Sequence, residues 1–182
     1  GELEQLDKPE QRRTLSANLA WAQQTYNGED INGNGGLDGS EDLNGNGKLD
    51  RYQLPSPPRQ PKVRVELANQ QVGVYWDKVS SEESVDPISK QKDFEGYRIY
   101  RSQTGSDFLS AENLLLSLSL VGEFDRSDDS TGYNTGFNQI RLSSPKVFPG
   151  DTNKYWYRFP PPNTGMTHLN GWQFVYGVSA FD

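Results

Sequence analysis

Oxygen-bearing side chains recur at regular intervals in residues 30–50, which read D-I-N-G-N-G-G-L-D-G-S-E-D-L-N-G-N-G-K-L-D. The stretch contains two copies of one pattern, offset by twelve residues. Carboxylates and amides at alternate positions are hard oxygen donors, and Ca²⁺ prefers about six to eight of them at about 2.3–2.6 Å. The glycines between the donors allow the backbone to turn around an ion through positive φ angles. The spacing therefore predicts two consecutive calcium-binding loops.

Each copy supplies candidate ligands at the first, third, fifth, seventh, ninth and twelfth positions of a twelve-residue loop. In the first loop these are Asp30, Asn32, Asn34, Gly36 (through its carbonyl), Asp38 and Glu41. In the second loop they are Asp42, Asn44, Asn46, Lys48 (through its carbonyl), Asp50 and Gln53. Since an amide cannot replace a bidentate carboxylate, we expect the second site to be weaker, or to be completed by an oxygen from elsewhere.

The spacing is that of an EF-hand loop, with Gly35 and Gly47 at the sharp turn. No helix fits between Glu41 and Asp42, so paired helix-loop-helix units are excluded. Back-to-back loops of this kind resemble the repeats of thrombospondin type 3 modules, the loops of dockerins and the N-G-N-G-x-L-D linkers of large bacterial secreted surface proteins. The resemblance implies a spacer stiffened by calcium and not a calcium switch. The alternative is a metal-free linker made of Asn-Gly turns.

The charge of the chain is concentrated in the same region. The 182 residues carry a net charge of −7, and residues 29–50 hold six acidic residues against one basic residue. This segment has too few apolar side chains to fold alone. The acidic balance argues against nucleic-acid binding, and no apolar run is long enough to cross a bilayer. The absence of Cys and the single His exclude disulfides, a Cys nucleophile and a multi-His metal centre.

The elements around the loops divide the chain into four segments. Residues 1–28 predict a helix over 9–25, with Asp7 as its N-cap, followed by the loops at 29–53 and a Pro-rich linker at 54–60. The helix carries an apolar stripe that includes Leu15 and Leu19. We expect the stripe to pack on the last segment, 61–182, and the alternative is docking on a neighbouring module.

The last segment shows short runs of alternating apolar residues, which predict about six strands without intervening helices. These runs lie at 63–67, 72–76, 94–101, 116–124, 155–159 and 172–180. The fold class expected is therefore mainly β, an antiparallel β-sandwich preceded by a helix and a calcium-loop linker.

Three motifs in this segment resemble those of fibronectin type III domains. They are V-Y-W-D at 74–77, F-E-G-Y-R-I-Y-R-S at 94–102 and Y-G-V-S-A-F-D at 176–182. In this resemblance Trp76 matches the core Trp of the second strand, Tyr97 and Tyr100 match the G-Y-x-I-Y pattern of the third strand, and Tyr176 matches the aromatic residue of the sixth. The resemblance also leaves the last strand of the fold missing, which implies that the chain continues or that another segment supplies the strand.

Other groups are weaker candidates for function. We expect the acidic loop that contains Asp125, Asp128 and Asp129 to be solvated, with a further cation site as the alternative. His168 is expected at the surface. Glu82, Glu83 and Asp86 could pair as glycosidase carboxylates but are expected to form a solvated charge run.

An aromatic platform for sugars is a further alternative. Trp156 and Trp172 flank long loops. Aromatic side chains on one face of a sandwich are more often part of the core, however.

The sequence thus predicts a non-enzymatic, calcium-stabilised structural or adhesive module of a bacterial extracellular surface or filament protein. Its cofactor would be calcium, and its partners would be other modules of the same or neighbouring chains, including copies of itself in a filament. The alternatives are a carbohydrate-binding accessory module of a secreted hydrolase, with a glycan as its ligand, and a filament subunit that completes its sandwich by strand exchange. Nucleic acid and membrane insertion are not expected.

Overall fold

The computed structural model describes residues 8–43, 45–102, 111–127, 132–161, 164, 166 and 168–182. The chain divides into two compact units. Unit 1 comprises Gly1–Ser56 and Val85–Gln91, and unit 2 comprises Pro57–Ser84 and Lys92–Asp182. The division falls inside the Pro-rich segment, but residues 85–91, which the sequence analysis placed in the sandwich, belong to unit 1. None of the helices that can be described is long and apolar enough to cross a membrane.

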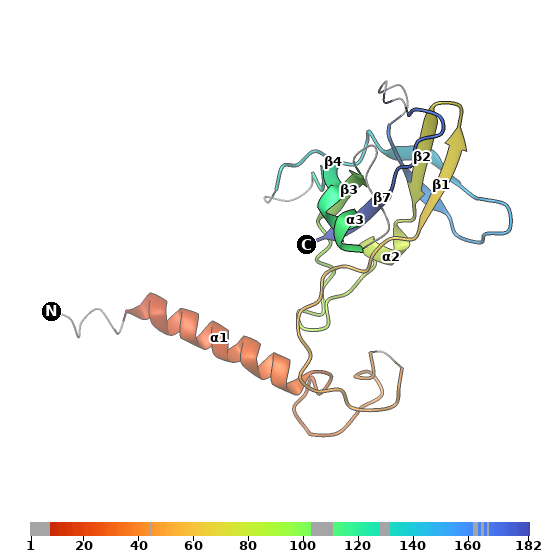
Figure 1. Ribbon diagram of the computed structural model, residues 1–182. Helices are drawn as coiled ribbons and strands as arrows, with labels where there is room; N and C mark the ends of the chain where they lie inside the picture. The colour runs from red at the N-terminus through yellow and green to blue at the C-terminus, as the bar shows by residue number, and fades with distance from the viewer. Residues whose placement is uncertain are drawn as a thin grey trace. The chain divides into compact units, whose positions relative to one another are not determined.

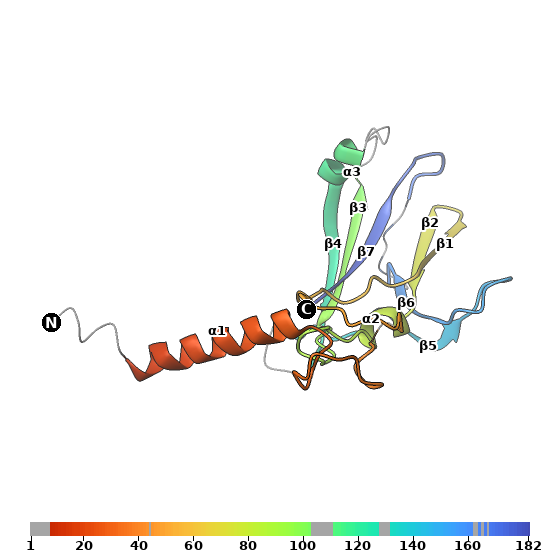
Figure 2. The ribbon, with the colours of Figure 1, turned by 90° about the horizontal axis from the view of Figure 1, so that it is seen from below.

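Unit 2 is built from two antiparallel sheets (Figures 1 and 2). The first sheet has the order β1 (Val63–Ala68), β2 (Gln71–Trp76), β6 (Tyr155–Phe159), β5 (Arg141–Lys146). The second has the order β4 (Leu118–Asp125), β3 (Gly96–Ser102), β7 (Tyr176–Phe181). The mainly β, antiparallel architecture predicted from the alternating runs is therefore confirmed.

The core of unit 2 forms where aromatic residues of the two sheets meet. Trp76 of β2, Tyr157 of β6 and Tyr97 of β3 are completely buried. The ring of Trp76 lies 5.6 Å from that of Tyr97, and the rings of Tyr97 and Tyr157 are 5.3 Å apart. Burial of such large side chains dominates the stability of a sandwich this size. Unit 2 therefore has a core of its own.

The structure corrects several element predictions in unit 2. Two short helices, α2 (Val79–Glu82) and α3 (Ala111–Ser117), lie between strands. The run of leucines around residue 116 forms the end of α3 because Ala, Glu and Leu favour helix, so the strand begins only at Leu118. β5 was not predicted because its sequence contains Pro145 and does not alternate, a composition tolerated in an edge strand. The segment from Trp172 precedes the last strand, which starts at Tyr176.

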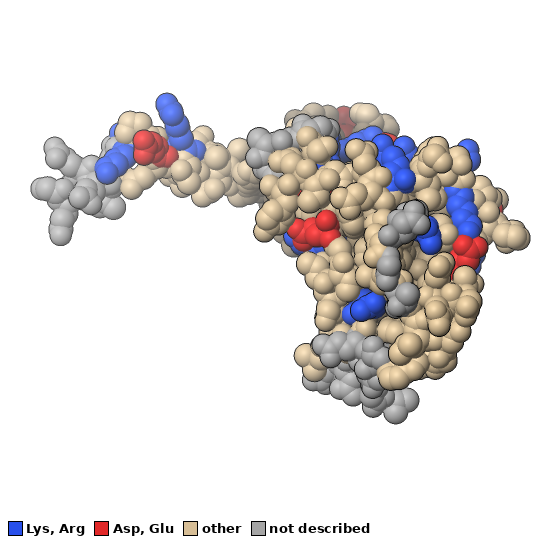
Figure 3. Space-filling view, turned by 90° about the horizontal axis from the view of Figure 1, so that it is seen from above, with Lys and Arg blue, Asp and Glu red and all other residues tan. Residues whose placement is uncertain are grey.

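Unit 1 begins with helix α1 (Pro9–Asn27), close to the predicted bounds. Its N-cap is Lys8, whose N–H donates to Oε1 of Gln11 at 3.5 Å, and Asp7 lies outside the described residues. No residue of α1 is buried: Leu15 is 70% exposed and Leu19 is 66% exposed. The charged side chains of α1 lie near its N-terminal end, and its remaining visible surface is uncharged (Figure 3). The leucines of the predicted apolar stripe are therefore exposed on α1.

Candidate metal centre

The two predicted loops are closed at their base by backbone contacts. Gly28 ends α1 by donating its N–H to the carbonyl of Gln24 at 2.9 Å, with φ at +60°. The next residue, Glu29, donates its N–H to the carbonyl of Asp50 at 2.9 Å. The start of the first loop therefore lies beside the end of the second, and residues 29–50 form one closed structure.

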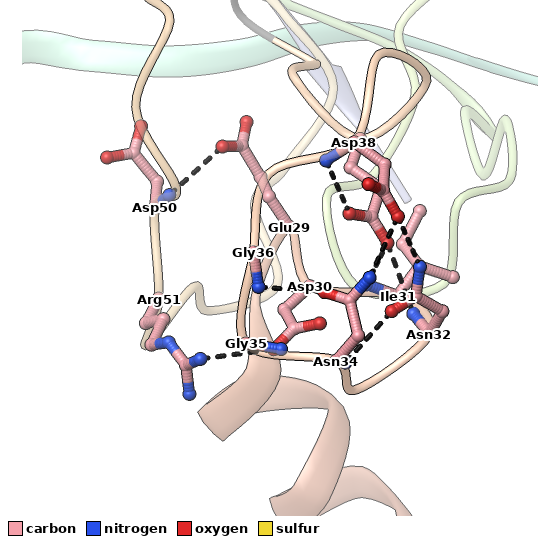
Figure 4. Close-up of polar contacts among 11 residues, drawn as sticks. Glu29, Asp30, Ile31, Asn32, Asn34, Gly35, Gly36, Asp38, Asp50 and Arg51 are labelled. Atoms are coloured by element: carbon pink, nitrogen blue, oxygen red, sulfur yellow. Dashed lines mark hydrogen bonds and ion pairs between the residues drawn. The ribbon is translucent and has the colours of Figure 1, made fainter.

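Loop 1 (residues 30–41) turns through hydrogen bonds between its own side chains and backbone. Oδ2 of Asp30 accepts the N–H of Gly35 at 3.0 Å. Oδ1 of Asn32 accepts the N–H of Asn34 at 2.9 Å, and Oδ1 of Asn34 accepts the N–H of Gly36 at 2.7 Å. The side chains predicted at the first, third and fifth positions therefore line the inside of one turn (Figure 4).

The carboxylates at the ninth and twelfth positions close the same loop. Oδ2 of Asp38 accepts amide N–H groups of Asn32 and Asn34 at 2.7 and 3.0 Å. Glu41 accepts the N–H groups of Ile31 and Asn32 on Oε1 and that of Asp38 on Oε2, at 3.0, 3.2 and 3.0 Å. The hydrogen bonds thus link five of the six predicted residues of loop 1, and the sixth, Asp30, holds the N–H of Gly35 between them.

Loop 2 (residues 42–53) repeats this pattern where it is described. Oδ2 of Asp42 accepts the N–H of Gly47 at 2.8 Å, as Asp30 does in loop 1. Oδ1 of Asn46 accepts the N–H of Lys48 at 2.7 Å, and its amide donates to Oδ2 of Asp50 at 2.8 Å. Asn44 lies outside the described residues. The repeat seen in the sequence is therefore also a repeat of hydrogen bonds.

The twelfth position of loop 2 is Gln53, and the carboxylate that holds the backbone of this loop comes from elsewhere in the chain. Glu29, and not Gln53, accepts the N–H groups of loop 2 that correspond to those held by Glu41 in loop 1. Its Oε1 accepts the N–H of Leu43 at 3.1 Å, and its Oε2 accepts that of Asp50 at 3.0 Å. The sequence analysis missed Glu29, although a Glu-Asp pair begins both copies of the repeat.

One carboxylate oxygen in loop 1 has no hydrogen-bond partner. Asp30 is only 2% exposed, and its Oδ1 is buried without a hydrogen-bond partner. Its Oδ2 is shared by Gly35 and the guanidinium of Arg51, 3.1 Å away. A buried carboxylate oxygen without a partner is costly, and a bound cation would remove that cost.

Besides the carboxylates of Asp38 and Glu41, the remaining donors in loop 1 are amide and backbone oxygens. Within the described residues no group of three or more His, Cys, Asp or Glu side chains forms a metal cluster. The amide oxygens of Asn32 and Asn34 each accept one N–H group, and a carbonyl oxygen has a second lone pair. Such neutral oxygens suit Ca²⁺, which takes carboxylate, amide and carbonyl donors together.

Residues 85–91 add an apolar and charged layer to unit 1. Asp86 accepts the N–H groups of Ser56, Ile88 and Ser89 at 2.7–2.9 Å, and these bonds lower its pKa although burial opposes its charge. Ile88 is buried, and Lys90 is placed where burial lowers the pKa of its amine while the negative charge of Glu29 opposes that shift. The acidic loops are therefore accompanied by an inserted segment that the sequence did not connect with them.

The other candidate residues take structural positions. Asp125 is buried and accepts the N–H groups of Tyr133 and Asn134 on Oδ2, at 2.6 and 3.2 Å. The expectation of a solvated loop is thus wrong for Asp125. Asp128 and Asp129 lie outside the described residues.

His168 is buried, which contradicts its expected place at the surface. Its Nε2 contacts the hydroxyl of Tyr176, and its ring packs edge-on against Phe174. Burial lowers the pKa of His168, and the positive charge of Arg101 lowers it further. The polar residues around His168 suggested exposure, but Phe174 and Tyr176, six and eight positions later, form an aromatic environment around its ring.

Of the three carboxylates expected to form a solvated charge run, Glu83 is exposed, whereas Glu82 is half-buried and Asp86 is buried. Glu82 accepts a hydrogen bond from the hydroxyl of Tyr157 at 2.6 Å, and Glu83 forms an ion pair with Lys92. Asp86 is buried in the other unit. Each carboxylate is therefore engaged by its own local partners.

The two tryptophans of the suggested sugar platform differ in their surroundings. Trp156 packs against the core of unit 2, and the amine of Lys78 lies 4.9 Å from the centre of its ring. Trp172 is 50% exposed. The core interpretation therefore applies to Trp156 but not to Trp172.

Comparison of the chain with protein-family models, with curated proteins and with solved structures finds no match in any of the three.

Proposed function

We propose that the chain is a non-enzymatic structural or adhesive module of an extracellular surface or filament protein, stabilised by calcium in loops 1 and 2. The observation that carries this proposal is the pair of loops with matching hydrogen bonds, together with the partnerless Oδ1 of Asp30. A spacer of Asn-Gly turns would not require the buried glutamate that precedes the first aspartate of each copy, Glu29 before Asp30 and Glu41 before Asp42.

The residues that would hold the ion follow from the loop contacts. In loop 1 they are Asp30, Asn32, Asn34, Gly36, Asp38 and Glu41. A bound cation would offset the repulsion between carboxylates that a closed loop brings close together, and so would stiffen unit 1. Extracellular modules with such loops work at dissociation constants of about 0.1–1 mM, which matches a structural role in a calcium-rich environment.

Isothermal titration calorimetry of the full chain tests the calcium proposal. We expect binding of Ca²⁺ at or below millimolar concentration, and loss of binding in loop 1 in Asp30→Ala. Glu10→Ala is a matched control, because Glu10 is an exposed acidic residue of α1. The absence of binding heat at millimolar Ca²⁺, or equal effects of the two substitutions, would refute the proposal.

The uncharged surface of α1 supports a contact with a neighbouring module. From Thr14 to Asn27 the helix carries no charged residue, and Leu15, Leu19 and Trp21 are exposed. We therefore keep a neighbouring module, of the same chain or of another, as the partner of this helix. Crosslinking from the single cysteine of Leu19→Cys in the full chain would identify that partner.

A second candidate function, the exchange of a strand between copies, is favoured by an observation in unit 2. Val65 of β1 is 51% exposed, although its cross-strand partner Val74 is completely buried. Among the described strands, β7 pairs with β3 alone, so its other edge is open. Both features fit a fibronectin type III-like sandwich whose last strand is provided by another segment.

Strand exchange predicts self-association of the full chain. Light scattering after size-exclusion chromatography should show multimers that are lost when Val65 is changed to Asp, while Leu54→Asp, at an exposed residue outside the sheets, should leave them intact. A chain that stays monomeric at high concentration would refute this candidate and would leave the calcium proposal untouched.

A further inference from the structure

We propose that Glu29 is the carboxylate ligand of loop 2, so that both sites take a glutamate from a Glu-Asp pair: Glu41, the last residue of loop 1, completes loop 1, and Glu29, the residue before loop 1, completes loop 2. The inference rests on the proposed calcium function. It assigns to the second site a residue that lies thirteen positions before its first ligand, Asp42.

The equivalence of Glu29 and Glu41 is visible in the N–H groups that they accept. Glu41 binds the N–H groups at the second and ninth positions of loop 1, Ile31 and Asp38, at 3.0 Å each. Glu29 binds the N–H groups at the second and ninth positions of loop 2, Leu43 and Asp50, at 3.1 and 3.0 Å. Each carboxylate therefore spans its loop in the same way.

Burial supports a ligand role for both glutamates. Glu29 is fully buried, and Glu41 is 3% exposed. A glutamate is almost never fully buried unless its charge is compensated. Burial lowers the pKa of Lys90, and the negative charge of Glu29 opposes that shift, so Lys90 lies close enough to compensate the charge of Glu29. Compensation by Lys90 alone is the competing explanation, and the experiment below separates the two.

The unpartnered oxygens are an independent sign of a ligand. Oδ1 of Asp30 is buried without a partner in loop 1, as shown above, and Oε1 of Gln53 is buried without one at the end of loop 2. Glu29 and Asp30 point in different directions: Glu29 toward Asp50 and Asp30 toward Gly35 (Figure 4). Neighbouring residues thus serve different loops.

This alternation links the two sites. The pair Glu29-Asp30 serves loop 2 and then loop 1, whereas the pair Glu41-Asp42 serves loop 1 and then loop 2. Ordering either pair around one cation places a ligand for the other. The two calcium ions should therefore bind with positive cooperativity, because the ordering cost is shared.

Calorimetry on four pairs of variants of the full chain tests the assignment. Asp30→Asn is used to weaken loop 1 and Asp42→Asn to weaken loop 2. Adding Glu29→Gln to Asp30→Asn should abolish the remaining binding, whereas adding it to Asp42→Asn should change the remaining affinity by less than about tenfold. Glu41→Gln should show the opposite pattern. A ligand should cost at least as much as an outer-shell partner, about 10–100-fold in affinity.

The outcomes separate the inference from the proposed function. If the unaltered chain binds no Ca²⁺, the proposed function fails. If the unaltered chain binds two ions and Glu29→Gln leaves both sites intact, or if it weakens loop 1 as much as loop 2, the assignment of Glu29 fails. Lys90→Met distinguishes a calcium ligand from a glutamate whose charge is compensated by Lys90 alone. Under the proposal this variant still binds two Ca²⁺ ions. Loss of the second ion in this variant would favour Lys90 as the partner of Glu29 and overturn the assignment.

Discussion

Substitution of Gly28 by Ala should open the base of both loops. Gly28 has φ at +60° and ψ at −115°, a combination that residues other than glycine rarely adopt. A Cβ atom added there would lie 2.2 Å from the carbonyl oxygen of Asp50 and 2.8 Å from Cα of Arg51. Both obstacles are backbone atoms, so the clash can be relieved only by moving the chain.

The cost follows from two contributions. The backbone conformation costs a residue with a side chain about 1–3 kcal/mol. Displacement of Asp50 also breaks the hydrogen bond from the N–H of Glu29, worth about 1 kcal/mol. Their sum is about 2–4 kcal/mol for closure of the loop pair. Gly45 is the matched control, since it has φ at +72° but no atom within 4 Å of an added Cβ, which leaves about 1–2 kcal/mol of conformational cost.

Hydrogen exchange of the calcium-loaded full chain measures the difference. The amides of Glu29 and Tyr52, which donate across the base, should lose about 30–1000-fold of their protection in Gly28→Ala and about tenfold in Gly45→Ala. Equal losses in the two variants would show that the contact between Gly28 and Asp50 does not close the loops, and the reasoning from the clash would be refuted.

Three further predictions concern unit 2. Tyr157→Phe removes the donor that Glu82 accepts at 2.6 Å and should lower the free energy of unfolding by about 1.5–3 kcal/mol, measured by urea titration. Burial lowers the pKa of His168, so the unfolded chain takes up its proton at a higher pH than the folded chain. Stability should therefore be complete above about pH 6.5 and fall as the pH decreases toward the folded pKa, and His168→Gln should flatten this part of the profile. Gly132→Ala places a Cβ 1.8 Å from Oδ2 of buried Asp125, at φ +68°, and should lower the melting temperature more than Gly150→Ala, which meets no atom.

Each of these has a result that would contradict it. An unfolding free energy unchanged in Tyr157→Phe would mean that Glu82 is satisfied by water. A stability profile that rises below pH 6.5 would show that His168 gains a charge partner on folding. Equal melting temperatures for the two glycine variants would show that Asp125 can leave its place without cost.

The order of residues along the chain predicted those helices and strands whose formation depends on neighbouring residues. The alternation of Val74 and Trp76 gave a strand because its apolar face packs against the other sheet, and Pro9 marked the start of α1 because its fixed φ suits the first turn. β5 was not predicted because an edge strand needs neither alternating apolar residues nor a backbone N–H at every position. Its place is set by pairing with β6, a contact that no local pattern contains.

The candidate site likewise contains residues that the sequence pattern predicted and residues that it did not. The turn residues of both loops were predictable, because Asp and Asn at fixed offsets bind the backbone of their own loop. The role of Glu29 was not, because its partners Leu43 and Asp50 lie 14 and 21 residues away. Likewise Lys90 belongs to a segment that enters unit 1 from the middle of the unit 2 sequence.

The contacts of Glu29 with loop 2 give a physical reason why two copies of the repeat occur together. A single twelve-residue loop would leave its leading glutamate without the N–H groups of a second loop, and its base would lack the contact between Glu29 and Asp50. Few apolar side chains are available in residues 29–50 to replace these bonds. Loop 2 therefore depends on Glu29, which precedes loop 1, and the base of loop 1 depends on the carbonyl of Asp50 in loop 2. The smallest unit expected to fold around calcium is the pair, together with Gly28 at its base.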